Sequence, residues 1–182
     1  VAEVYGPDYA QSRTKAKQLA ARMAKTGGIV DIDSTVEAEV TREQLLIDQA
    51  FGNFYDVMFR VSVNSFMGNY LDMVNNAKAN PTTGQQPNEN YAREILQLFA
   101  VGLYELKADG TLLLDAGGNP IPTYDQDDIV ELSKVFTGWT YWPLAGQSAR
   151  WNAPINYAFN MMPIESPTNY HDTGTKNILG YV

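Results

Sequence analysis

Apolar residues recur along much of the chain at spacings of three and four, which is the period of an amphipathic helix. The stretch FYDVMFRV at residues 54–61 is the clearest example. Thr41 and Asp125 each begin a capping pattern in front of such a stripe, and capping patterns mark helix starts. The sequence predicts helices over residues 12–25, 41–51, 54–61, 65–73, 88–99 and 125–136.

The period changes between residues 104 and 124. Two turn signals, Asp109-Gly110 and Gly117-Gly118, stand on either side of three consecutive leucines, and such turns join antiparallel strands. From Trp139 onward the chain is irregular, aromatic and rich in proline, and no internal repeat is evident. The pattern therefore predicts a mainly α fold: an irregular multi-helix domain with an inserted β-hairpin at about residues 104–124 and an aromatic, loop-rich C-terminal part.

The length of 182 residues is sufficient for one domain with a sizeable core. Apolar residues make up 45% of the chain and charged residues 19%, which is the composition of an ordinary globular protein. We expect residues 1–182 to form a single domain or part of one. The chain begins without Met and ends in NILGYV, which has the composition of a strand start, so we expect a segment of a longer protein.

The chain is acidic and has no cysteine. It carries 13 basic and 21 acidic residues, for a formal charge of −8, and the basic residues form no cluster. Such a protein is unsuited to binding a phosphate backbone or an anionic membrane, so nucleic acid is not expected as a partner. The absence of cysteine excludes disulfides and thiolate-bound metals. No apolar run approaches the roughly 20 residues of a membrane span.

The stretch PNENYAREILQLF admits two interpretations. In an ordinary amphipathic helix, Asn88 is the N-cap. Glu89 and Arg93 then form an i,i+4 ion pair, and Asn90 pairs with Glu94 in the same way. In the second interpretation, Asn88, Glu89, Asn90 and Arg93 bind a polar ligand, while Glu94 acts in catalysis. A divalent metal is then the candidate cofactor, although the sequence does not identify the metal. Periodicity does not choose between the two.

His171 is the only histidine and stands in the segment HDTGTKNILG. One histidine cannot form a multi-histidine metal site within this chain. Asp172 and Lys176 lie close enough in sequence to tune its ring as an acid or a base. His171 and Asp172 are therefore candidate catalytic residues and Lys176 a candidate binding residue. The alternative is a histidine that stabilises a turn, because Asp172-Thr173-Gly174 is a common turn signal.

Trp139 and Trp142 begin the aromatic C-terminal tract. Flat aromatic rings near carboxylates can stack against sugar rings, so both tryptophans are candidate binding residues and a glycan is a candidate ligand. The alternative is that these rings pack over the edge of the core.

Three motifs follow one another along the chain: PNENYAREILQLFAVGLYEL, PTYDQDDIVELSKVFTGWTY and HDTGTKNILG. With the upstream stretch FGNFYDVMFRVSVNSFMGNYLDMV, they resemble the bacterial family called domain of unknown function 1800 (DUF1800) over residues 51–180. That family has an Asn-Glu-Asn-x-Ala-Arg-Glu-Leu helix, a helix ending in Thr-Gly-Trp and a His-Asp-x-Gly-x-Lys segment. The chain departs from the pattern at Ile95 and Asp125, and residues 1–50 match it poorly.

The resemblance implies a protein exported by Gram-negative or related bacteria to the periplasm, the outer surface or the medium. It also implies a longer, mainly helical protein, so the expected partners are the remainder of its own polypeptide or a companion exported protein. Two functions stay open. One is a binding, envelope-associated or surface structural role. The other is a metal-assisted or glycan-directed hydrolase, with a site built from the Asn90/Arg93/Glu94 helix and His171/Asp172.

Overall fold

The computed structural model describes residues 45–164 and 170–181, together with residues 14, 15, 18, 19, 21, 22 and 25. The chain divides into two compact units, residues 1–53 and 54–182. In the first unit, the described residues from 14 to 22 and residues 45–48 are helical, as predicted, whereas residues 49–51 form a turn. The predicted helix start at Thr41 lies outside the described residues.

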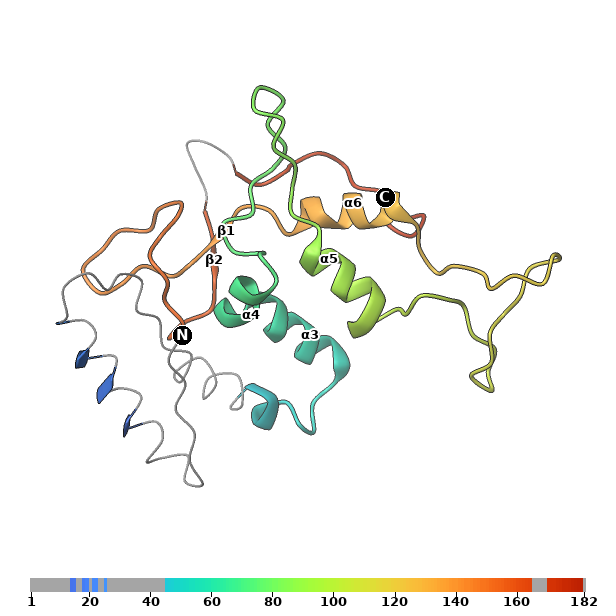
Figure 1. The fold of residues 1–182 in the computed structure, drawn as a ribbon, viewed down its shortest axis with the longest axis horizontal. Helices are drawn as coiled ribbons and strands as arrows, with labels where there is room; N and C mark the ends of the chain where they lie inside the picture. The colour runs from blue at the N-terminus through green and yellow to red at the C-terminus, as the bar shows by residue number, and fades with distance from the viewer. Residues whose placement is uncertain are drawn as a thin grey trace. The chain divides into compact units, whose positions relative to one another are not determined.

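The second unit contains the elements that position the candidate site (Figure 1). Its helices among the described residues are α3 (Phe54–Val63), α4 (Ser65–Tyr70), α5 (Asn90–Glu94), the π-helical η1 (Ile95–Phe99) and α6 (Gln126–Val135). Each lies in a stretch whose apolar period predicts a helix. The helix α4 ends earlier than predicted, and Asp72 follows it with a left-handed φ of 54°. A left-handed residue terminates the helical hydrogen-bond pattern.

Local capping explains where two of these helices begin. The side chain of Asn64 accepts hydrogen bonds from the N–H groups of Phe66 and Met67 at the start of α4. Asp125 and Asp128 form a reciprocal capping box at the start of α6. A cap of this kind stabilises a helix by about 1 kcal/mol, because it satisfies N–H groups that have no partner within the helix.

The helix α5 lies between two clusters of buried apolar side chains. Tyr91 belongs to one cluster with Met73 and Met161, and its neighbour Ala92 belongs to the other with Leu96 and Ile129. The Tyr91 ring meets the Phe136 ring edge-on, with the ring centroids 4.8 Å apart. Consecutive residues of one short helix thus contribute to both clusters, which fixes the orientation of the polar side of α5.

The unit also contains a two-stranded antiparallel sheet, which follows α6 along the chain. Its strands are β1 (Trp139–Thr140) and β2 (Met162–Pro163), and the loop between them buries Tyr141, Ala153 and Tyr157. Outside the helices and this small sheet, the described residues form mostly turns and irregular segments. The predicted mainly α class is therefore confirmed only in part. No helix among the described residues is long and apolar enough to cross a membrane.

Residues 102–123, here called the arm, leave the end of η1 and return to the start of α6 (Figure 1). Antiparallel bridges join residues 104 and 122, 106 and 112, and 114 and 120. Each of three short segments therefore pairs with both of the others. The predicted antiparallel pairing is present, but the arrangement has three segments and is not a simple hairpin.

The arm is built from an eight-residue repeat. Glu105 N–H donates to the carbonyl of Ile121 (2.9 Å), Ile121 N–H to that of Leu113 (3.1 Å), and Leu113 N–H to that of Glu105 (2.8 Å). These hydrogen bonds form a closed ring with approximate threefold symmetry. Gly102, Gly110 and Gly118 occupy the same repeat position, with φ values of 87°, 81° and 82°. The sequence did not reveal this repeat, because few positions other than the glycines share a residue type among the three copies.

Candidate functional site

The start of α5 is held by a buried asparagine that sequence reasoning missed. Asn76 accepts a hydrogen bond from Asn88 N–H at 2.8 Å and donates one to the Asn88 carbonyl at 3.3 Å. The Asn88 side chain accepts from Asn90 N–H at 2.8 Å. The helix begins one residue later than the predicted cap, with Glu89 at the N-cap position. Asn88 nevertheless satisfies one of the first helical N–H groups, as a cap does.

Glu89 and Arg93 form the predicted ion pair, with 2.8 Å between Arg93 Nη2 and Glu89 Oε2. The same Glu89 oxygen accepts a hydrogen bond from Gln126 Nε2 at 2.9 Å. Gln126 is the first residue of α6, so this cluster connects the first turns of α5 and α6. The side chains of Arg93 and Glu89 are 41% and 33% exposed, and an ion pair at such exposure contributes at most about 1 kcal/mol.

Asn90 and Glu94 do not form the expected pair. Asn90 Nδ2 donates instead to Asp72 Oδ2 at 2.9 Å, which ties α5 to the left-handed residue that follows α4. Glu94 is half-buried and makes no side-chain hydrogen bond or ion pair with another described residue. It is the last residue of α5, immediately before the π-helical turn η1. Glu94 is therefore the candidate catalytic residue whose side chain is still available to a ligand.

The segment Thr137-Gly138, which follows α6, packs against His171 and Asp172. His171 Nδ1 lies 2.8 Å from the Thr137 carbonyl. Because a carbonyl can only accept, Nδ1 carries the proton in this bond. Asp172 N–H donates to Thr137 Oγ1 at 2.9 Å. Gly138 has a φ of 86°, and a Cβ there would lie 2.8 Å from the His171 Cβ. The two segments can approach this closely only because residue 138 is a glycine.

Lys176 pairs with the Asp172 carboxylate and also binds backbone carbonyls of the turn between them. Lys176 Nζ lies 3.3 Å from Asp172 Oδ1 and donates to the Gly174 carbonyl at 2.8 Å. Burial raises the pKa of the Asp172 carboxyl, but the Gly174 N–H and the charges of Lys176 and Lys134 lower it further, to below its usual value. The carboxylate therefore stays ionised near neutral pH, which makes it unsuitable as a general acid.

The two candidate tryptophans lie in different surroundings. Trp139 is partly buried and packs against the cluster that contains Tyr91, which agrees with the interpretation as core packing. Trp142 is 45% exposed, with its ring centroid 6.1 Å from that of Phe159. A further stacked pair, Trp151 and Tyr170, has its centroids 4.0 Å apart. Trp142 alone of the two predicted residues presents its ring at the surface.

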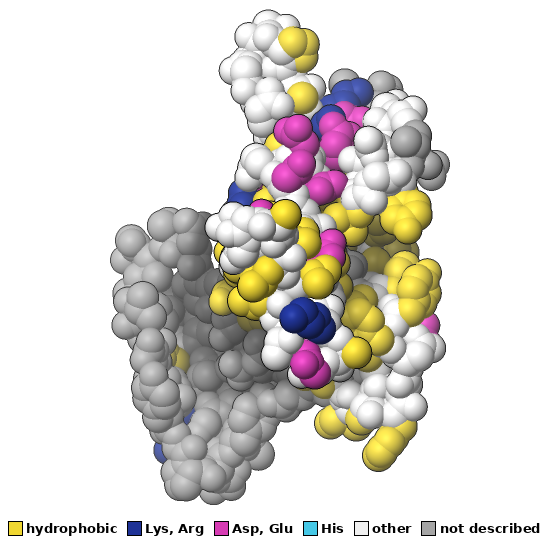
Figure 2. Space-filling model, turned by 90° about the vertical axis from the view of Figure 1, so that its right-hand side faces the viewer, with side chains coloured by type: hydrophobic (Ala, Val, Ile, Leu, Met, Phe, Trp, Pro, Cys, Tyr) yellow, Lys and Arg dark blue, Asp and Glu magenta, His cyan; other side chains and the backbone are white. Residues whose placement is uncertain are grey.

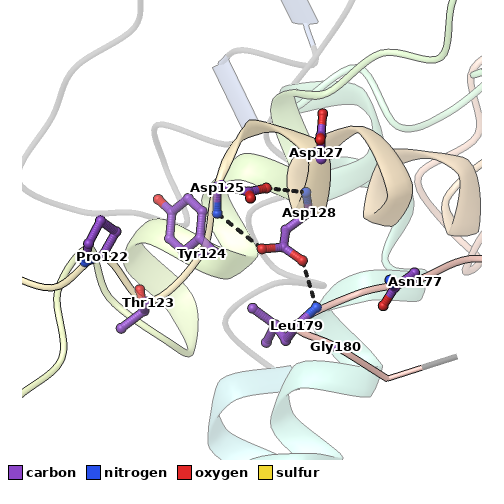
Figure 3. A pocket seen from close by; sticks show the side chains of 9 residues that line it. All are labelled: Pro122, Thr123, Tyr124, Asp125, Asp127, Asp128, Asn177, Leu179 and Gly180. Carbon is purple, nitrogen blue, oxygen red and sulfur yellow. Dashed lines mark hydrogen bonds between the residues drawn. The ribbon is translucent and has the colours of Figure 1, made fainter.

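A depression of about 600 Å³ lies where the arm returns to α6 (Figure 3). Its lining consists of Pro122, Thr123, Tyr124, Asp125, Asp127, Asp128, Asn177, Leu179 and Gly180. The Asp128 carboxylate accepts hydrogen bonds from Asp125 N–H at 3.0 Å and Leu179 N–H at 2.6 Å. None of the sequence-predicted site residues lines this depression. The acidic first turn of α6 is the sequence signal that could have indicated it.

The three motifs meet through a chain of partly buried hydrogen bonds between five residues, here called the motif junction: Asn88, Asn76, Thr137, Gly138 and His171. Besides its contacts with Asn88, the Asn76 carbonyl accepts from Gly138 N–H at 2.8 Å. Thr137 then contacts His171. Asn76 and Thr137 are only 6% and 1% exposed. Most of the polar groups singled out by sequence thus join segments that are distant along the chain.

The fold and the site define a class: a helical unit with a small antiparallel sheet, a β-bridged arm and a partly buried polar junction. No group of three or more acidic or histidine side chains among the described residues could hold a metal ion.

The chain belongs to the family described as protein of unknown function (DUF1800), whose profile matches residues 14–182. The match begins well before residue 51, so the kinship extends further toward the N-terminus than the motifs indicate. No curated protein and no solved structure matches the chain.

Proposed function

We propose that this protein is exported to the bacterial envelope or the medium and has a binding or structural role there, without catalysis by the described unit. The observation that carries the proposal is the motif junction, in which Asn88, Asn76, Thr137, Gly138 and His171 bind one another. Export is supported by the family resemblance alone.

The state of the candidate catalytic groups favours this role. A general acid or base must reach a substrate and have a pKa near the working pH. The His171 Nδ1 proton is held by the Thr137 carbonyl. The pKa of Asp172 is lowered, and its carboxylate faces Lys176. These contacts give both side chains a structural role, and the ionised Asp172 carboxylate has no proton to donate near neutral pH.

The test uses the full-length protein and addresses location and chemistry separately. Fractionation of the native bacterium is expected to recover the protein from the periplasm, the outer membrane fraction or the medium. Purified protein is expected to contain no stoichiometric metal and to hydrolyse none of a panel of chromogenic glycosides and esters. Recovery from the cytoplasm would refute the export proposal. Turnover that Glu94→Gln abolishes in a folded protein would refute the non-catalytic role.

A hydrolase is the second candidate, and one observation favours it. Glu94 is half-buried, has no side-chain partner among the described residues and directly precedes a π-helical turn. Such turns are frequent at functional sites. If Glu94 holds a divalent metal together with groups outside the described residues, Glu94→Gln should lower the metal content of full-length protein. The matched variant Glu131→Gln changes a carboxylate on α6 that pairs with Lys134, and it should leave the metal content unchanged.

A further inference from the structure

The arm presents backbone groups that its own pairing leaves free. Residues 104, 106, 112 and 114 form bridges in which their own N–H and C=O groups point away from the bridge partner. Accordingly, Tyr104, Leu106, Leu112 and Leu114 donate no backbone hydrogen bond to any described residue. Their side chains are 44%, 60%, 42% and 47% exposed. A row of unpaired backbone groups beside exposed apolar side chains is a template for an added strand.

The third repeat differs from the first two at the equivalent positions. Pro120 and Pro122 stand where the other repeats have Tyr104, Leu112, Leu106 and Leu114. Proline has no N–H group and is one of the residues that protect a strand edge from pairing. The arm therefore has two edges that can accept a strand and one edge that cannot.

The charge of the arm indicates which strand would bind. Residues 102–123 contain Glu105, Asp109 and Asp115 against the single basic residue Lys107, a formal charge of −3 + 1 = −2, in a chain whose formal charge is −8. Figure 2, which views the side toward which the arm projects in Figure 1, shows hydrophobic, acidic and fewer basic side chains on this face. A second copy of this chain would bring like charges together, whereas a basic strand would be attracted.

We propose that the arm binds an extended, basic segment of another protein as an added β-strand, along residues 104–106 or residues 112–114. The segment would have apolar residues at alternate positions, to pack beside the exposed leucines, and Lys or Arg between them. This inference rests on the proposed binding role and names a surface and a class of partner for it.

The first experiment uses a short synthetic peptide of alternating valine and lysine, blocked at both ends, titrated into the 182-residue chain. We expect saturable binding and slower hydrogen exchange at the amides of Tyr104 and Leu106, or of Leu112 and Leu114. The control is the same peptide with alternate backbone amides methylated, which keeps the charge and removes the donors. Since each backbone hydrogen bond contributes a factor of about 2 to 10, the control should bind at least about tenfold more weakly.

Two pairs of variants test the arm itself. Leu106→Pro with Leu114→Pro copies the residue that the third repeat has at Pro122, and it should weaken peptide binding at least about tenfold. Leu106→Ala with Leu114→Ala removes similar apolar surface but keeps both N–H groups, and it should weaken binding less. Circular dichroism establishes whether each variant is folded. If the proline variants unfold, the comparison of the two peptides decides the question alone.

Four results would overturn the proposal. The first three are no peptide binding, equal binding of the methylated peptide, and protection confined to amides outside the arm. The fourth is self-association that the proline variants abolish, which would assign the edges to a second copy. If the arm binds no strand, the proposed function still stands, as an exported, non-catalytic protein that binds a partner through another surface. Conversely, turnover abolished by Glu94→Gln refutes the proposed function whatever the arm does.

Discussion

Replacing Gly138 by alanine tests the packing that brings the second and third motifs together. The left-handed φ of 86° costs a residue with a Cβ about 1–2 kcal/mol. The added Cβ would also lie 2.8 Å from His171 Cβ and 3.0 Å from the His171 N and Cα atoms. Backbone atoms cannot move aside as a flexible side chain does, so overpacking adds about 1–3 kcal/mol. We expect Gly138→Ala to lower the free energy of unfolding by about 3 kcal/mol.

The matched control is Gly110→Ala. Gly110 has a similar φ of 81°, but a Cβ there would meet no atom within 4 Å. It should cost only the backbone term, about 1 kcal/mol after the smaller entropy of the unfolded alanine chain is included. In thermal unfolding the two variants should differ by roughly 4–8 °C. Equal losses of stability in both would refute the close approach of Gly138 to His171.

Three further variants probe the polar contacts. Asn76→Ala should lower the free energy of unfolding by about 1–3 kcal/mol in urea titrations, because it removes the hydrogen bonds that the buried Asn76 side chain makes with the Asn88 N–H and carbonyl. Arg93→Ala should cost less than about 1 kcal/mol, an effect that high salt should reduce. The pKa of Asp172 is lower in the fold than in the unfolded chain, so its ionised form stabilises the protein above about pH 4. That contribution is lost as the pH falls through the folded-state pKa, and Asp172→Asn should flatten the acid limb of the stability profile.

For each of these three predictions, one result would contradict the stated cause. Asn80→Ala removes an exposed asparagine that caps a loop turn, and a cost as large as that of Asn76→Ala would show that burial is not the cause. A salt-independent loss in Arg93→Ala would indicate lost packing of its alkyl chain rather than lost charge pairing. An unchanged acid limb in Asp172→Asn would mean that other carboxylates set the acid stability.

Local features of the sequence were predictable because neighbours along the chain determine them. The capping box of Asp125 and the ion pair of Glu89 with Arg93 both join residues three or four positions apart, which is the reach of one helical turn. Both are present in the structure. The kinship was also predictable, since three ordered motifs indicated the family whose profile matches residues 14–182.

The motif junction was not predictable in the same way. Asn76 reaches Asn88 across a loop of the chain, and Thr137 meets His171 at a sequence separation of 34. Periodicity carries no information about such contacts, because they depend on how the helices pack. The expected pair of Asn90 and Glu94 failed for a related reason: Asp72, distant in sequence, offered Asn90 a partner that the helix surface alone does not contain.

Gly102 shows why the arm was mistaken for a simple hairpin. Its N–H donates to the Leu96 carbonyl at 2.8 Å, which satisfies a carbonyl near the end of the helical segment. The same glycine is the first of the three repeat glycines, and Thr123 at the end of the arm donates its hydroxyl to the Gly102 carbonyl. One residue thus bonds to the last turn of η1, begins the repeat and accepts a hydrogen bond from the returning chain. A hairpin needs a turn only at its tip, whereas this arm also needs a glycine at its base. The base is therefore held by η1 and by the returning end of the arm, so a strand added to the arm would meet edges that are already held in position.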